Sequence, residues 1–215
     1  MKPKIQCTAY TAKRLNDAEQ QELSLMLLRA LRADENLAEF YALAKEDKIL
    51  QHLLPDLCGM HTIAWPELFP ALILAVSLQM APMKRSNQMM DLLMQHFGEG
   101  AEFDHKIVRY WPSPERIATT SVDELKIKAK LGYRAQNLVA IAQALQQGFP
   151  TMDKLYAMEP TEAKQKLLNL RGIGYYSAEL IMPSMGFPLD VGAPKSSASS
   201  STMQRRRTRV RRYLS

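Results

Sequence analysis

Residues 166–180, KLLNLRGIGYYSAEL, decide the expected fold, because one helix must end and another begin within a few residues. Gly172 and Gly174 flank the apolar Ile173, and glycine tolerates positive φ and a close approach to the backbone. The first N–H groups of the second helix have no partner inside that helix. Such a turn suits an anion such as a DNA phosphate, with Ile173 pointing inward to hold the hairpin. On these residues alone, an ordinary glycine-capped connection between two helices stays an open alternative.

Helical periodicity extends through most of the chain. Apolar residues recur at helical spacing in residues 17–34, where Asp17 is a candidate N-cap, and in residues 36–54, which we expect Pro55 to end. Residues 65–80, WPELFPALILAVSLQM, predict a largely buried helix, and no segment shows the alternation of a strand. The sequence therefore predicts an all-α body with short connections.

The charge of the chain is concentrated in its last residues. The formal net charge is +6 and the pI about 9.3, which suggests an acidic partner such as nucleic acid. Residues 192–215, however, hold seven Lys and Arg and no acidic residue, so residues 1–191 carry a net charge of −1. The basic character of the whole chain is therefore no argument about the folded body.

Other compositional features exclude several classes of protein. Cys7 and Cys58 are the two cysteines, too few for a disulfide framework or a four-cysteine metal site. The sequence shows no apolar run of the length that a membrane span needs and no apolar signal-peptide core. We expect a protein of a reducing compartment such as the cytoplasm.

The residues around the hairpin resemble the helix-hairpin-helix DNA glycosylase superfamily. The similarity is carried by LNLRGIGYYSAELIM (168–182) with GFPLDV (186–191), by FPALILAVSLQMAP (69–82) and by WPSPERIATTSVDELKIKAKLGYRAQNLVAIAQAL (111–145). Within the superfamily the 3-methyladenine DNA glycosylase II group is the best match. The resemblance implies a glycosylase core over residues 65–191, with residues 1–64 forming an N-terminal helical segment that packs on it.

The resemblance also implies a catalytic carboxylate and a phosphate-binding turn. Asp190 falls where the family has its catalytic Asp, which would stabilise the positive charge that develops on the sugar and activate a water. By position alone, Asp190 is equally suited to cap a following helix. The turn implied to bind DNA phosphate consists of Gly172, Ile173, Gly174 and Tyr175.

Five residues are implied to contact the damaged site in DNA. Tyr176 stands where bifunctional members have a Schiff-base Lys; it cannot form that imine and is suited to stack on a flipped base. Gln79 matches a glutamine that helps position the opened helix, and Met80 or Met83 follows it where the family inserts an apolar wedge. Trp65 is a candidate pocket wall. For all five, ordinary packing or a polar helix end is the alternative.

These features predict a monofunctional glycosylase that hydrolyses the N-glycosidic bond of alkylated purines in double-stranded DNA. We expect a monomer that needs no metal and no iron–sulfur cluster, although the resemblance leaves room for a monovalent cation at the hairpin. The resemblance also implies a location at the nucleoid in the cytoplasm of a bacterium, or in the nucleus of a eukaryote. Two alternatives stay open: a different lesion, such as oxidised guanine or a mismatched base, or a noncatalytic helix-hairpin-helix DNA-binding module.

Residues 192–215 do not fit the rest of the sequence. GAPKSSASSST follows Val191 where the family continues with a long helix, and the Ser- and Arg-rich tail predicts no packed structure. One nucleotide inserted after the Val191 codon turns suitably chosen synonymous codons into VWSAKIFSELFYN, which has helical periodicity. We interpret the tail as a frame-shifted end, and a disordered basic arm that binds phosphates is the alternative.

Overall fold

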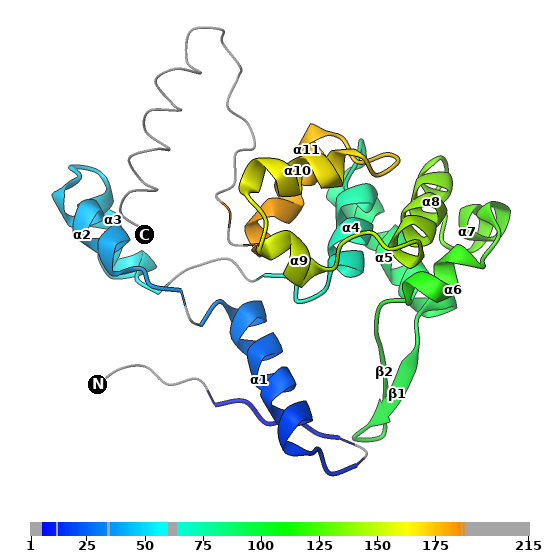
Figure 1. Cartoon of the computed structure of the whole chain (residues 1–215), viewed down its shortest axis with the longest axis horizontal. Helices are drawn as coiled ribbons and strands as arrows, with labels where there is room; N and C mark the ends of the chain where they lie inside the picture. Colours follow the sequence, from blue (N-terminus) through cyan, green and yellow to red (C-terminus); the bar gives the residue numbers. More distant parts are fainter. Residues whose placement is uncertain (1–5, 12, 34, 60–63, 186, 188–215) are drawn as a thin grey trace, which may run out of the picture.

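The computed structural model describes residues 6–11, 13–33, 35–59, 64–185 and 187 and is predominantly helical (Figure 1). The elements are α1 (Asp17–Leu31), α2 (Ala38–Glu46), α3 (Leu50–Leu57), α4 (Leu68–Ser77), α5 (Met83–Phe97), β1 (Gly100–Phe103), β2 (Lys106–Arg109), α6 (Pro114–Ala118), α7 (Val122–Lys128), α8 (Arg134–Gln146), α9 (Met152–Tyr156), α10 (Pro160–Leu168), α11 (Tyr175–Ile181) and the short 3-10 helix η1 (Met182–Met185). Helices α4 to α11 gather into one body, and α1 to α3 extend away from it (Figure 1).

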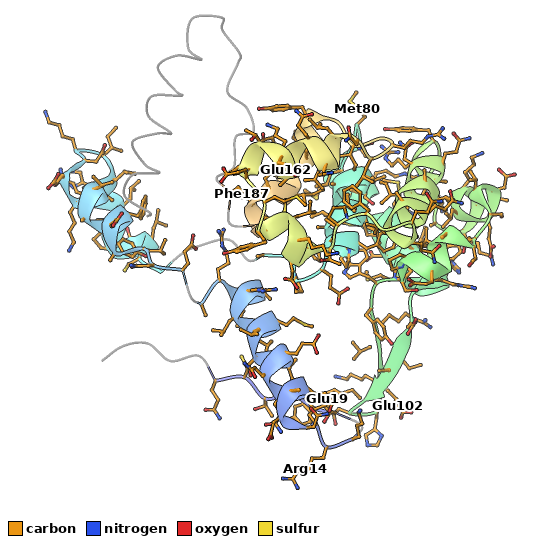
Figure 2. The ribbon with its side chains drawn as sticks, in the orientation of Figure 1. Arg14, Glu19, Met80, Glu102, Glu162 and Phe187 are labelled. Carbon is orange, nitrogen blue, oxygen red and sulfur yellow. The ribbon has the colours of Figure 1, made fainter. Side chains whose placement is uncertain are left out.

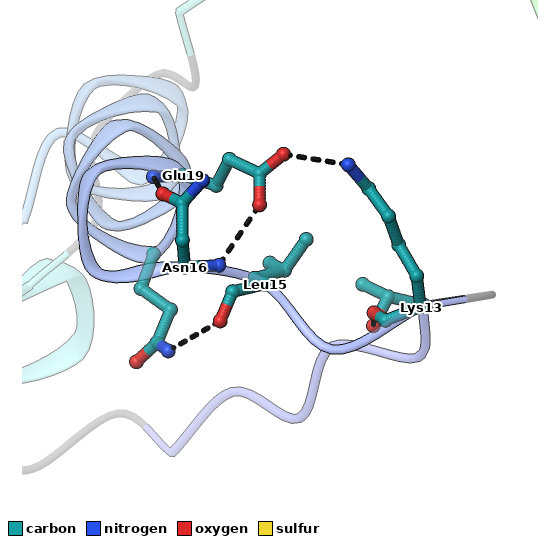
Figure 3. Close-up of polar contacts among 6 residues, drawn as sticks. Lys13, Leu15, Asn16 and Glu19 are labelled. Atoms are coloured by element: carbon teal, nitrogen blue, oxygen red, sulfur yellow. Dashed lines mark hydrogen bonds and ion pairs between the residues drawn. The ribbon is translucent and has the colours of Figure 1, made fainter.

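Helix α1 begins one residue earlier than the sequence predicts. Asn16 caps it, because its side chain accepts a hydrogen bond from the Glu19 N–H at 2.9 Å. The Glu19 carboxylate accepts in return from the Asn16 N–H and also pairs with Lys13 (Figure 3). This reciprocal capping box satisfies backbone donors that the helix itself cannot use.

The predicted helix over residues 36–54 is divided into two. Asp47 ends α2, and its carboxylate accepts hydrogen bonds from the Ile49 and Leu50 N–H groups at the start of α3. Those two bonds lower the pKa of Asp47. Pro55 lies inside α3 and does not end it, which differs from the expectation.

The hydrophobic core surrounds α4. Nine of the ten residues of α4 are buried, and the helix packs against α5, α8 and α11. This explains why its sequence is apolar on all sides. The buried cluster draws its members from Leu68 to Met185, within the range predicted for the core, whereas no residue of α1 is buried. The domain boundaries themselves stay a prediction.

One element is not helical, so the prediction that no strand forms was wrong for residues 100–109. Strands β1 and β2 pair as an antiparallel hairpin in which Phe103 stands opposite Lys106. All eight strand residues are exposed. The β-hairpin projects from the body of α4 to α11 toward the start of α1 (Figure 1), where Phe103 packs against Tyr10. The mostly helical fold is otherwise as predicted.

Two predictions concern residues beyond this description. Asp190 and the tail of residues 192–215 both lie outside the described residues.

None of the helices that the structure describes combines the length and the apolar character that a membrane crossing requires.

Candidate nucleic-acid interface at the hairpin

The hairpin between α10 and α11 has the local geometry that its glycines require. Ile173 is only 5% exposed, and its N–H donates to the Leu170 carbonyl at 3.0 Å. Gly172 has φ +80°, and a Cβ there would lie 2.3 Å from Asn137 Nδ2. Gly174 caps α11 with an extended backbone, has no side-chain cap, and would place a Cβ in open space. The turn is thus closed on the Gly172 side and open on the Gly174 side.

The turn between α4 and α5 presents a methionine to solvent. Met80 is 95% exposed and has φ +46°, a left-handed backbone conformation that residues other than glycine seldom adopt. Figure 2 shows its side chain projecting at the edge of the helical body, beside α11. Met83, at the start of α5, is also exposed. Two apolar side chains are therefore exposed to solvent at this turn, although apolar residues in the rest of the helical body are mostly buried.

Hydrogen bonds join this turn to the hairpin and to the turn before α8. Gln79 Nε2 donates to the Gly172 carbonyl at 2.7 Å and to Ser177 Oγ at 3.0 Å. The Arg134 guanidinium donates to the Gln79 carbonyl. Arg85, at the start of α5, forms a second link to the turn before α8, because it donates to the Lys130 carbonyl at 2.9 Å. Three segments that are distant in sequence thus lie side by side.

We call these three segments, residues 78–85, 129–137 and 168–177, the hairpin face. They contain no Asp or Glu. Their exposed cationic residues are Lys84, Arg85, Lys130 and Arg171, and a fifth, Arg134, is buried. Their exposed apolar and aromatic side chains are Met80, Met83, Tyr133, Tyr175 and Tyr176. Cationic and aromatic groups without carboxylates are typical of a surface that binds nucleic acid. The face is basic although residues 1–191 carry a net charge of −1.

A partly buried ion pair joins the two helices of the hairpin. Lys164 on α10 pairs with the buried Glu179 on α11, and its ammonium lies 3.6 Å from the centre of the Tyr175 ring. Burial disfavours the charged form of Lys164, but Glu179 and Tyr175 outweigh this effect and raise the pKa of Lys164 above its ordinary value. Lys164 therefore stays charged and holds the ring of Tyr175, the first residue of α11, against its ammonium group.

The structure brings most of the predicted contact residues together and separates one. Gln79, Met80, Met83 and Tyr176 belong to the hairpin face. Trp65 precedes the opposite end of α4; it packs edge-on against Trp111 with ring centres 6.0 Å apart and donates its backbone N–H to Ser184 Oγ. Trp65 also lines a cavity of about 220 Å³ there. If Trp65 forms a pocket wall, it does so at this cavity and not at the hairpin face.

Sequence reasoning did not single out the cationic residues of the face or Tyr133. Lys130, Tyr133 and Arg134 come from a turn that has no unusual motif, and the Arg134 guanidinium lies 4.6 Å from the Tyr133 ring centre. A signal was nevertheless present, since all three segments lack acidic residues. Among the described residues, no group of three or more His, Cys, Asp or Glu side chains is arranged to bind a metal ion.

Comparison with known proteins points to one superfamily. No family model matches the chain. A DNA-3-methyladenine glycosylase of Bacillus subtilis is 29% identical over 161 residues, which cover 72% of this chain and 52% of the relative. This chain therefore spans about half the length of the curated relative that it matches.

Solved structures of DNA glycosylases have the same fold. A 3-methyladenine DNA glycosylase from Archaeoglobus fulgidus superposes with a TM-score of 0.67 at 20% identity, over 82% of this chain and 60% of the other. The 8-oxoguanine glycosylase/lyase of Clostridium acetobutylicum, solved with double-stranded DNA containing cytosine opposite 8-oxoguanine, gives 0.68 at 16% identity, over 84% and 67%. At these identities the likeness establishes the fold, and the sequence relative agrees with it.

Proposed function

We propose that this chain, which has the fold of the helix-hairpin-helix DNA glycosylases, removes alkylated purines from double-stranded DNA as a monofunctional glycosylase. The observation that carries the proposal is the hairpin face, where a helix start without a side-chain cap, four exposed cationic side chains and an exposed methionine occur together. The Bacillus subtilis relative, which bears the name of a 3-methyladenine glycosylase, supports the choice of substrate.

DNA binding would begin at the hairpin. The N–H groups at the start of α11 are suited to donate to a phosphate, because the open side of Gly174 lets the backbone approach it. Arg171 and Lys84 are exposed and would add attraction to neighbouring phosphates. Met80 would fill the gap that a flipped nucleotide leaves in the stack.

Chemistry would require little more than one carboxylate and an aromatic wall. A purine alkylated at N3 or N7, such as 3-methyladenine or 7-methylguanine in DNA, carries a positive charge and is therefore already a good leaving group. Tyr176 is half exposed at the hairpin and would stack on such an electron-poor base. Tyr176 has no amine and forms no Schiff base, which supports a hydrolytic reaction without strand cleavage. Asp190 would stabilise the developing charge on the sugar and activate water.

Further expectations concern cofactors, oligomeric state and location. We propose that the enzyme acts as a monomer, needs no metal or iron–sulfur cluster, and works where genomic DNA is found. The monovalent cation that the family resemblance allows at the hairpin is part of this proposal as an optional ligand.

The direct test is base release by the purified chain, after its helical content has been checked by circular dichroism. Duplexes containing 3-methyladenine or 7-methylguanine are expected to lose the free base, and matched duplexes with 8-oxoguanine, a G:T mismatch or no lesion are expected not to. The free base is measured by chromatography. Tight binding to an abasic duplex with no release from any substrate would instead indicate a noncatalytic DNA-binding module.

The hairpin face makes a separate prediction about salt. Lys84→Gln and Arg171→Gln are each expected to weaken binding to an undamaged duplex about three- to tenfold at low salt. Each is also expected to reduce the slope of log K against log salt by about one, since one phosphate contact is lost. Titrations by fluorescence anisotropy at several salt concentrations measure both. Lys45→Gln on α2, outside the face, is the matched control, and an equal effect of this control would contradict the assignment.

A further inference from the structure

We infer that Gln79 is a positioning residue that acts through Met80, and that with Arg134 it forms a bracket locking the Met80 turn to the hairpin. The inference rests on the proposed function, and it revises the expectation that Gln79 itself touches DNA. On the structure, the side chain of Gln79 is directed into the protein and is used there.

The side-chain amide of Gln79 is committed to the hairpin. Its Nε2 carries two hydrogens, and the two acceptors are Gly172 O at 2.7 Å and Ser177 Oγ at 3.0 Å. A backbone carbonyl only accepts, so the orientation of the amide is fixed by the first of these bonds. The two acceptors lie on either side of the turn, so one side chain spans the start of α11.

The backbone of Gln79 is held as well. The Arg134 guanidinium donates to the Gln79 carbonyl, and Arg134 is only 8% exposed. Arg134 Nε is buried with no hydrogen-bond partner among the described residues, and the Tyr133 ring lies beside the guanidinium. If Arg134 moved away, the buried guanidinium would lose its bond to the Gln79 carbonyl as well, and this loss disfavours the movement. The peptide that leads into Met80 is therefore fixed at its carbonyl.

The far side of the turn is anchored independently. Ser86 is completely buried, and its hydroxyl lies 2.9 Å from the Ser77 carbonyl and 3.4 Å from the Pro82 carbonyl. Met80 therefore stands between two fixed points. Its left-handed φ and its exposed side chain are imposed by these neighbours, because a methionine does not favour that conformation by itself.

The bracket makes one unit of two segments that are 93 residues apart in the chain. When the hairpin binds a phosphate, the bracket already fixes the distance between Met80 and that phosphate. Removing the Gln79 donor should leave the hairpin able to bind DNA but should misplace the wedge. This separates a positioning role from a DNA contact.

The test uses Gln79→Met, which preserves length and removes the donor, with Gln146→Met at the exposed far end of α8 as control. Gln79→Met is expected to slow excision of an alkylated purine about tenfold in single-turnover assays. Binding to undamaged duplex should change less than threefold. A 2-aminopurine opposite the lesion should lose most of its fluorescence rise, since Met80 no longer opens the stack. The control should match the wild type.

A double variant decides between the two roles of Gln79. If Gln79 acts through Met80, then Gln79→Met/Met80→Ala excises no more slowly than Met80→Ala alone. If Gln79 touches DNA itself, the two effects multiply, and the inference is overturned.

A measurement without DNA keeps the inference testable if no base is released. The Ile173 and Ala178 amides donate to Leu170 and Gly174 within the hairpin. In Gln79→Met their hydrogen exchange is expected to be about tenfold faster than in the wild type. Unchanged exchange would refute the bracket, whereas faster exchange in a protein that releases no base would leave the bracket standing and overturn only the proposed function.

Discussion

Asp190→Asn is expected to lower the rate of base excision by a hundredfold or more while leaving affinity for an abasic duplex within about threefold. Asparagine has nearly the same shape as aspartate but carries no charge. It therefore cannot balance the positive charge that develops on the sugar as the base departs, and it is a poor acceptor for a proton from water. Single-turnover excision of 7-methylguanine measures the rate, and anisotropy on an abasic duplex measures the affinity.

The matched control is Asp91→Asn, which removes one carboxylate from an exposed position on α5. Equal loss of activity in both variants would show that net charge, rather than a carboxylate at residue 190, governs the reaction. A fully active Asp190→Asn would remove Asp190 from the mechanism and would favour a pocket in which the charged base leaves without a carboxylate.

The helical elements were predictable where the signal is local. Ser113, Ser121 and Thr151 each accept a bond from the N–H three residues on, so a short polar residue before an acidic turn marked a real helix start. Ile173 between two glycines likewise predicted an inward side chain. Such signals need only neighbouring residues, and they do not depend on the rest of the fold.

The β-hairpin was missed for a specific reason. Its two turn residues, Asp104 and His105, both have positive φ, which is the geometry of a tight hairpin turn. Glycine at the second position is the usual signal for such a turn, and His105 conceals it. The strands are exposed on both faces, so they show no alternation of apolar and polar residues.

The hairpin face was beyond prediction for a different reason. Gln79, Arg134 and Gly172 are brought together by tertiary packing of α4, α8 and α11, and no local pattern links them. Trp65 shows the converse: it is near Gln79 in sequence, but a buried helix of ten residues separates the two. The resemblance to a family supplied Gln79, Met80, Met83 and Tyr176 as candidates for one site, and the structure linked Arg134 to them.

The two glycines of the hairpin are expected to fail in opposite ways when each is replaced by alanine. Gly172→Ala should reduce the free energy of unfolding by about 2 kcal/mol or more, because a left-handed alanine is strained and its Cβ would meet Asn137. Gly174→Ala should change that free energy by less than about 0.5 kcal/mol, since its φ of −90° suits any residue and the space around it is open. Chemical denaturation measures both.

Gly174→Ala, which should leave stability unchanged, is expected to weaken DNA binding. The added methyl group of Gly174→Ala occupies the side from which a phosphate would reach the start of α11, so affinity for duplex DNA should fall about tenfold in a fully stable protein. Asn137→Ala is the partner for the other glycine. It removes the Cγ and Nδ2 that a new Cβ at residue 172 would meet, but it keeps the Asn137 Cβ at 2.8 Å, so it should restore only part of the lost stability. If Gly174→Ala bound DNA as well as the wild type, the phosphate would have to approach elsewhere on the hairpin face, and the cationic residues rather than the turn would be the principal contact.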